Sequence, residues 1–395
     1  MPAPARSSAA RPGIPTDLGA CGLTIMSDDN RYATEIIRDP TRFDALGPAW
    51  DELFERALKP HVNQSFAWAS CVWETIMKPR GGRLHVLVLR EGDRPVLIWP
   101  LVVLEYGRFL RAVHPLMMGS DDNDVLVEAS PEAAALARLA VRALRKSRGH
   151  DLVVTEWVRT NSMLDGALSP VPAVQTDVTR SVAWSGFADW AAYERGLSSR
   201  QSTDRRLRRL RECGHVDFAL VENPDRQRAL VAWLVRQKLD RLAGQDIVPL
   251  WQGEPMENFI IAASRRVTRF GKLLLFAMTL DDEPIAVQIA IQDAHGLLAF
   301  QIAHEPKFGK YGPGILIAQQ FLHWAFERRL PVELGWGDSA FKKVFSNGED
   351  KISTRIFPTS TWGKARMGIR AWQGERQAAR EARQAGKDHD GHERQ

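Results

Sequence analysis

The sequence predicts an α/β fold with a mixed sheet, and it predicts that this unit is built twice in tandem. Two apolar β-hairpin patterns of the same kind occur far apart, at 84–104 and at 274–292. Each is preceded by an amphipathic helix pattern and followed by another helix and another strand. A chain of 395 residues, 44% of them hydrophobic, is long enough to bury two such cores.

The first unit begins with apolar residues at helical spacing in "DALGPAWDELFERAL" (44–58). The hairpin "LHVLVLREGDRPVLIWPLVVL" (84–104) follows, and Pro95 opens its returning strand. A helix is expected over 130–147, with Ser130 as N-cap and Pro131 at the first helical position. The apolar run "DLVVTEWV" (151–158) predicts the strand after it.

The second unit repeats this order. A helix pattern at 226–242 precedes the hairpin "LLFAMTLDDEPIAVQIAIQ" (274–292), in which Pro284 matches Pro95. A helix from Gly314 to Arg329 and a strand at 331–337 complete the unit.

These patterns divide the chain into four parts. Residues 1–33 lack a continuous apolar segment and are expected to be disordered, and so is the charged tail 361–395. The two units are expected to occupy 34–180 and 181–360. An arginine-rich helix within 186–218 is expected to be a solvated face, or alternatively a wall that binds phosphate.

Composition narrows the class of protein. The formal net charge of +5 is mild, and much of the excess lies in the C-terminal tail, so DNA is not an expected partner and neither is RNA. Cys21, Cys71 and Cys213 are too widely spaced to suggest disulfides or a metal site. No signal peptide or membrane span is indicated, so we expect a cytoplasmic protein.

The two units differ at the start of their second helix. The first begins with Ser-Pro-Glu, an ordinary cap with an acid in the first turn. The second begins Gly312-Pro313-Gly314, preceded by Lys307, Lys310 and Tyr311, and carries no acid there. A helix N-terminus presents free N–H groups and partial positive charge, so glycines here would let an anionic ligand approach. A simple tight turn into the helix remains the alternative.

At this point the residues resemble a known family. The strand end "FQIAH", the "KYGPG" loop, the long helix and the segment "VELGWGDSAFKKVF" are similar to the acyl-CoA N-acyltransferase (GNAT) superfamily. Within it they look most like the CelD-like cellulose-biosynthesis branch, which is related to the Fem aminoacyl transferases. The patterns at 197–214 and 66–73 are similar to that branch as well, so the resemblance covers about residues 35 to 360.

The resemblance implies two tandem GNAT-like domains, with the donor site kept in the second. Acetyl-CoA or another acyl-CoA would be the co-substrate, and no metal is implied. Its pyrophosphate would lie on the backbone of Lys310, Tyr311, Gly312 and Gly314. Its pantetheine arm would follow the strand from Phe300 to His304, past Ile302 and Ala303, where a strand N–H would polarise the thioester.

Three residues are candidate catalytic groups. Asp338 would act as a general base or bind the acceptor amine, or else cap the helix that follows it. Lys342 would stabilise the tetrahedral oxyanion, or else be a solvated helix lysine. His304 ends the strand where the thioester would lie, and it is either a base or a structural histidine. Glu333 is expected to form a structural salt bridge.

Two departures from the family pattern affect the function. Position 309 is glycine where the wider superfamily has arginine or glutamine, and none of the four tyrosines follows residue 334 to protonate a leaving thiolate. The expected activity is acyl transfer to an amine of a sugar, lipid-linked precursor or small metabolite, in the setting of exopolysaccharide or cellulose biosynthesis. The alternatives are a Fem-like transferase using aminoacyl-tRNA and a non-catalytic assembly protein. The sequence does not predict the oligomeric state.

Overall fold

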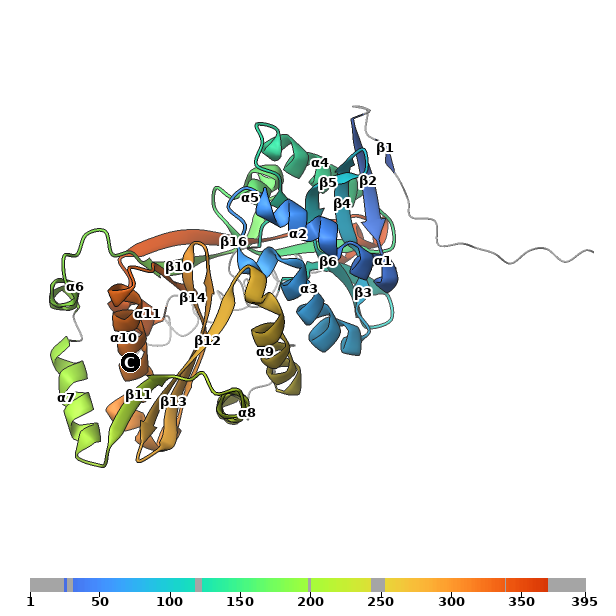
Figure 1. Cartoon of the computed structure of the whole chain (residues 1–395). Helices are drawn as coiled ribbons and strands as arrows, with labels where there is room; N and C mark the ends of the chain where they lie inside the picture. The colour runs from blue at the N-terminus through green and yellow to red at the C-terminus, as the bar shows by residue number, and fades with distance from the viewer. Residues whose placement is uncertain are drawn as a thin grey trace, which may run out of the picture.

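The protein is described by a computed structural model covering residues 25–26, 31–117, 123–197, 200–242, 253–337 and 339–368. Helices lie on both sides of a long mixed sheet, as Figure 1 shows. The predicted mixed α/β fold class is therefore confirmed. No described helix is both long enough and apolar enough to cross a bilayer.

The first half of the chain runs from the N-terminus to β10. Its helices and strands are β1 (Ile25–Met26), β2 (Tyr32–Ile37), α1 (Pro40–Ala45), α2 (Gly47–Glu55), α3 (Phe66–Val72), β3 (Arg83–Leu84), β4 (Val86–Glu91), β5 (Arg94–Trp99), β6 (Leu101–Tyr106), β7 (Leu110–Pro115), β8 (Leu126–Val127), α4 (Ala133–Lys146), β9 (Leu152–Arg159), α5 (Met163–Leu168) and β10 (Ala173–Val182).

The second half follows β10. Its helices and strands are α6 (Trp190–Gly196), α7 (Arg200–Arg211), β11 (Val216–Leu220), α8 (Pro224–Leu242), α9 (Glu254–Arg266), β12 (Lys272–Leu280), β13 (Glu283–Asp293), β14 (Gly296–His304), the 3₁₀ segment η5 (Pro306–Tyr311), α10 (Pro313–Glu327), β15 (Val332–Trp336), α11 (Ala340–Phe345) and β16 (Gly348–Pro358).

The two hairpins of the internal repeat form as predicted. In β4–β5, Pro95 pairs with Arg90 beside a shift in register, and in β12–β13, Pro284 pairs with Thr279 beside a similar shift. The second turn places both Asp281 and Asp282 at positive φ, which is the geometry of the two-residue turns that suit the twist of a hairpin. The repeated proline therefore marks the same irregularity in each half.

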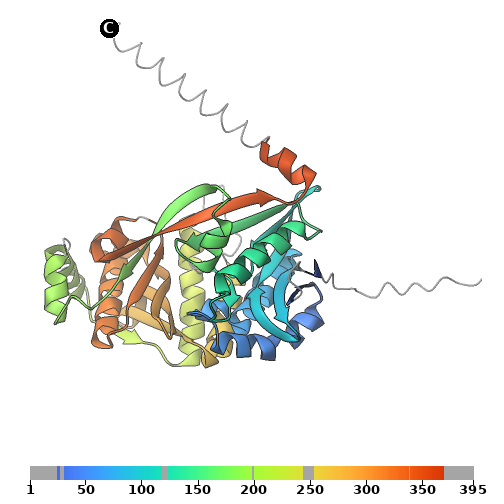
Figure 2. The same cartoon turned by 90° about the horizontal axis from the view of Figure 1, so that it is seen from above.

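The large sheet joins the halves through two exchanged strands. Within the described residues the strand order is β11-β12-β13-β14-β15-β10-β16-β9-β7-β6-β3, and a second sheet has the order β1-β2-β4-β5-β8. β10, the last strand of the first half, pairs with β15, while β16, the last strand of the second half, pairs with β9. Figure 2 shows these two long strands running side by side from one half to the other.

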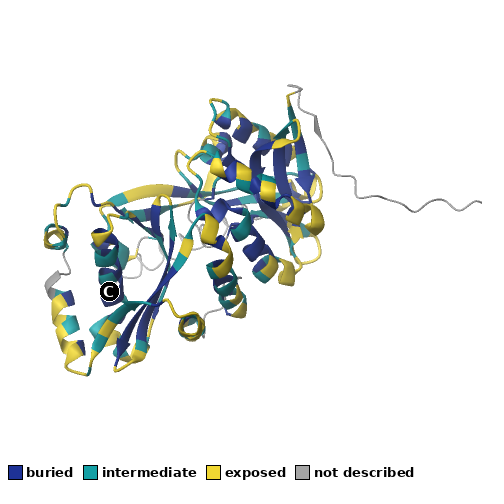
Figure 3. Ribbon diagram, in the orientation of Figure 1, coloured by how far each residue is buried: buried dark blue, intermediate teal, exposed yellow. Residues whose placement is uncertain are grey.

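The hydrophobic core is continuous across the halves. Trp68 of α3 packs edge-on against Phe259 of α9 with ring centroids 4.9 Å apart, and it also contacts Phe300 of β14. Figure 3 shows the buried residues concentrated along the strands and on the inner faces of the helices. Each half thus buries apolar surface against the other, which is the main favourable contribution to folding.

Some sequence predictions need correction. The helix expected from Ser130 begins later, at Ala133, and its N-cap is Glu132 rather than Ser130. Ile25–Met26 pairs with β2 and 31–33 are described, although we expected disorder through residue 33. Residues 361–368 are helical, whereas disorder was expected from residue 361, and 369–395 lie outside the described residues.

Candidate active site

The candidate site forms where β14 and β15 separate. Among the described residues these parallel strands pair only at Leu297 with Val332 and at Leu298 with Glu333. Beyond Leu298, β14 keeps β13 as its neighbour on one side and has no strand partner on the β15 side. The backbone N–H and C=O groups along this stretch are therefore open to pairing with an extended ligand.

A bulge lies at the point where the strands diverge. Ile289 of β13 pairs with Gln301, while the next residue, Ala290, pairs with Ala299, so Phe300 has no direct partner. Bulges re-aim backbone groups and are frequent beside active sites. Ile302 then packs on the α10 side of the sheet, and Ala303 is buried on the α8–α9 side. The two predicted strand residues thus face opposite sides of the sheet.

His304 is the last residue of β14 and lies against the first turn of α10. A Cβ atom added to Gly314 would lie 3.1 Å from His304 Cδ2, so the imidazole occupies the space that the missing side chain leaves. Gly312 precedes the helix in the left-handed conformation, with φ of 63°, and no side chain caps α10. A side chain at either glycine would therefore meet an obstacle, and at Gly312 it would also strain the backbone.

Arg206 of α7 reaches the same helix end. Its Nη1 atom lies 3.1 Å from the position that a Cβ of Gly312 would take. Arg205, Arg208 and Arg209 are exposed, as expected for a solvated face, whereas Arg206 is half-buried against the loop. The structure therefore adds one guanidinium to the N-terminus of α10, which is the arrangement that attracts phosphate groups.

The loop residues Lys310 and Tyr311 belong to η5. The Lys310 ammonium lies 4.9 Å from the centre of the Tyr311 ring. The Tyr311 hydroxyl is 3.1 Å from Sγ of Cys213, at the end of α7. This contact holds η5 against α7, so Tyr311 has a positioning role in the free protein and the lysines stay at the surface.

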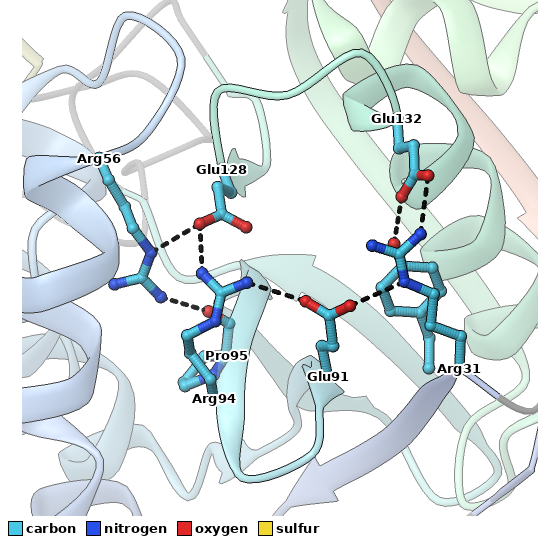
Figure 4. Close-up of polar contacts among 8 residues, drawn as sticks. Arg31, Arg56, Glu91, Arg94, Pro95, Glu128 and Glu132 are labelled. Atoms are coloured by element: carbon cyan, nitrogen blue, oxygen red, sulfur yellow. Dashed lines mark hydrogen bonds and ion pairs between the residues drawn. The ribbon is translucent and has the colours of Figure 1, made fainter.

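The N-terminus of α4, the equivalent helix of the first half, lies beside charged side chains of the protein itself. Glu132 stands at the N-cap position of α4, but its side chain makes no capping hydrogen bond and pairs with Arg31 instead (Nη1–Oε1 2.8 Å). Arg31 continues through Glu91 into the ion-pair chain drawn in Figure 4. A hydrogen bond from Tyr32 lowers the pKa of Glu132, which keeps the carboxylate ionised. A negative charge at this helix end leaves no place for a phosphate. Neither helix has a side-chain cap, so the predicted contrast in capping is wrong, and the two helices differ in the carboxylate of Glu132 at the start of α4.

Two of the remaining predicted residues, Lys342 and Glu333, lie on the β15 side of the opening. Lys342 of α11 donates a hydrogen bond to the carbonyl oxygen of Trp336, the last residue of β15. Asp338 lies outside the described residues, and the N-cap of α11 is Ser339, not Asp338. Glu333 pairs with Arg159 of the first half (Oε2–Nη2 3.2 Å), so the expected salt bridge is present.

Sequence reasoning missed a buried lysine beside the bulge. Lys238 of α8 donates to the side-chain oxygen of Gln301, which is itself buried on the α8–α9 side of β14. Burial, helped by the charge of Arg241, lowers the pKa of Lys238 to about 8. The helical spacing of 226–242 placed a lysine at this position without showing which strand it faces.

One protein-family model matches part of the chain. Residues 198–343 match the family model described as an acetyltransferase (GNAT) domain. This match lies within the second half of the chain. No curated protein sequence matches the chain.

Solved structures share the fold at low sequence identity. FemX superposes with a TM-score of 0.52 at 10% identity, covering 77% of this chain and 95% of that one. The C-terminal domain of a putative lysylphosphatidylglycerol synthetase from Agrobacterium fabrum gives 0.51 at 11% identity, covering 83% and 96%. A conserved protein of unknown function from Bacteroides thetaiotaomicron gives 0.50 at 11% identity, covering 78% and 97%. These likenesses concern the fold, and they extend over both halves of the chain.

Proposed function

We propose that the protein transfers an acyl group from acyl-CoA, acetyl-CoA in the simplest case, to an amine. The acceptor would be a sugar, a lipid-linked precursor or a small metabolite, in the CelD-like setting of exopolysaccharide synthesis. The single observation that carries the proposal is that the open edge of β14, the uncapped N-terminus of α10 and Arg206 lie next to one another. The GNAT domain match covers all three.

The donor would lie along this surface with its charged end at α10. The pyrophosphate would meet the helix N-terminus near Gly312 and Gly314, with the Arg206 guanidinium as counter-charge. The pantetheine amides would pair with the β14 edge, and the thioester would reach the bulge at Phe300. The family's usual arginine or glutamine is replaced by Gly309, and Arg206 would supply the missing charge from another helix.

The reaction itself needs a neutral amine and a stabilised oxyanion. The amine nitrogen bonds to the thioester carbon, the C–S bond breaks, and the thiolate leaves and takes up a proton, giving an amide and free CoA. A backbone N–H at the bulge would bind the developing oxyanion, and the Lys342 ammonium at the end of β15 would add a positive charge. Asp338 and His304 remain the proposed groups for removing the amine's proton.

Calorimetric titration with CoA and acetyl-CoA tests the donor site. Arg206→Gln should weaken binding about 10- to 100-fold, since charge-assisted phosphate contacts contribute about 1.5–3 kcal/mol. Arg205→Gln removes the same charge from an exposed position of the same helix and should bind like wild type. Gly314→Trp should abolish binding, because its side chain would displace the His304 ring. Absence of binding by wild type at millimolar ligand, or equal effects of the two arginine variants, would refute the donor site.

A Fem-like transferase using aminoacyl-tRNA is the second candidate. Its support is the shared fold with FemX together with the exposed arginines of α7. It predicts RNA binding whose affinity falls steeply with salt and depends on Arg205, Arg208 and Arg209 together. If neither CoA nor RNA binds, the non-catalytic role in assembly becomes the proposal to pursue.

A further inference from the structure

A small cavity lies between the two halves, beside the candidate site. It has a volume of about 110 Å³ and is lined by the loop 61–63, by β9 and β10, and by the adjoining ends of β13, β14 and β15. The pairs β10–β15 and β9–β16, which join the halves, both contribute to the lining, because Thr179 belongs to β10 and Arg159 to β9. The cavity therefore exists only when the halves are joined.

Thr179 is the feature of this cavity that the fold alone does not explain. Its side chain is 1% exposed, and its hydroxyl oxygen has no hydrogen-bond partner. A buried hydroxyl without a partner is unfavourable, and native proteins seldom keep one without a reason. Valine has nearly the same shape and would avoid this cost, so the hydroxyl points to a ligand that supplies the missing partner.

The rest of the lining combines apolar side chains, such as Val62, Ile291 and Leu298, with a cross-sheet ion pair. Arg159 and Glu333 meet 3.2 Å apart although β16 and β10 separate their strands, so their side chains pass over these strands. The amide of Asn63, 4% exposed, comes from the first half. Hydroxyl, amide and carboxylate groups around one cavity match a ligand rich in hydroxyl and amino groups.

An exposed indole stands next to the cavity. Trp336 pairs in register with Thr179, and directly opposed residues of neighbouring strands project from the same face of the sheet. Trp336 is 44% exposed and stacks on Trp157 with centroids 5.5 Å apart and an interplanar angle of 24°. A fixed aromatic face beside polar groups suits the C–H face of a sugar ring.

The cavity also lies within reach of the proposed reaction centre. Leu298 lines it and pairs with Glu333, and Phe300 at the bulge comes two residues later on the same strand. A strand rises about 3.3 Å per residue, so the cavity and the bulge are about 7 Å apart. A ring held in the cavity could place an amino group at a thioester on the β14 edge.

We propose that this cavity is the acceptor subsite and that it binds an amino sugar, with Thr179 bonded to a ring hydroxyl and Trp336 against the ring. This inference rests on the proposed acyl transfer for its role, but binding of the sugar does not depend on the donor. Thr179 is a binding and positioning residue here and takes no part in proton transfer.

The test is binding of glucosamine, measured by saturation-transfer NMR and by thermal shift without CoA. Wild type should bind glucosamine in the millimolar range and bind it more tightly than the simple amine ethanolamine. Thr179→Val should weaken glucosamine binding about ten-fold, because a hydrogen bond to a buried group is lost. Its melting temperature without ligand should equal or exceed that of wild type, since the hydroxyl has no partner in the free protein.

Two further variants control this result. Thr179→Ser keeps the hydroxyl and should restore binding, and Thr176→Val changes an exposed threonine of the same strand and should leave binding unchanged. The inference is overturned if wild type does not bind glucosamine, if Thr179→Val binds it normally, or if Thr179→Val is clearly less stable without ligand. CoA titration of Thr179→Val should match wild type, so loss of CoA binding in all proteins would count against the donor proposal alone.

Discussion

The buried histidine pair of the first half makes the protein acid-sensitive in a way that one substitution can measure. His85 and His150 are 1% and 4% exposed, and their rings meet edge to face with centroids 5.0 Å apart. Burial, together with nearby positive charges, lowers the pKa of His85 to about 3 and that of His150 to about 4. Both imidazoles are therefore neutral in the folded protein at any pH above about 5.

The magnitude follows from the difference between folded and unfolded pKa values. An unfolded histidine titrates near 6.5, so between pH 7 and pH 4.5 the unfolded chain takes up protons that the folded protein does not. Stability consequently falls as the pH decreases through this window. For His150 alone the loss is about 2.5 kcal/mol at pH 4.5, at 1.36 kcal/mol per pKa unit. That is a large part of the stability of an ordinary domain.

Replacing His150 by phenylalanine removes the proton site and keeps an aromatic ring against His85. Urea unfolding at pH 7 and pH 4.5 should show that His150→Phe loses about 2 kcal/mol less than wild type over this interval. His215→Gln, at an exposed position, should lose as much as wild type. If His150→Phe and wild type lose equal stability, His150 is not buried in its neutral form and the reasoning fails.

Three further predictions concern the candidate site and the junction of the halves. Gly312→Ala should lower the free energy of unfolding in urea by about 1–2 kcal/mol, because alanine is strained at φ of 63°. It should also weaken CoA binding, because the added Cβ would displace Arg206. Gly309→Ala should have neither effect, because no atom lies within 4 Å of the added Cβ. In a Cys21→Ser background, a maleimide should label Cys213 and not Cys71, because Cys71 is buried and burial raises the pKa of its thiol to about 11. CoA should slow the labelling of Cys213. A labelling rate unaffected by CoA would place the donor away from α7. Arg159→Met should destabilise the protein by about 1–2 kcal/mol, because it removes the ion pairs of Arg159 with Glu333 and Asp350. An unchanged midpoint in urea would show that these half-exposed pairs contribute nothing.

The sequence predicted local elements well because their signals are local. Pro95 and Pro284 marked two hairpins of the same form, and glycines with no acid nearby marked a helix end unlike that of α4. The residues that shape the site from a distance were not predictable. Arg206 was one of several arginines on a polar helix, and only the packing of α7 against η5 distinguishes it from Arg205.

The residues that line the cavity were even less predictable from the sequence. Thr179 and Arg159 carry no motif, and their meeting with Glu333 depends on which strands are neighbours. Linear order would place β10 beside β9, yet β16 lies between them. Strand order across a sheet is set by long-range packing, which periodicity within a segment does not reveal.

The exchange of β10 and β16 has a consequence for how the chain is made. β9 emerges from the ribosome long before its neighbour β16, which comprises residues 348–358 near the C-terminus. Until residues 348–358 have been made, the nascent first half presents an unpaired strand edge, which is a template for association with other chains. A chain that stops before residue 348 would keep that edge permanently. The last strand thus completes both halves at once, and pairing between such distant segments makes folding slow.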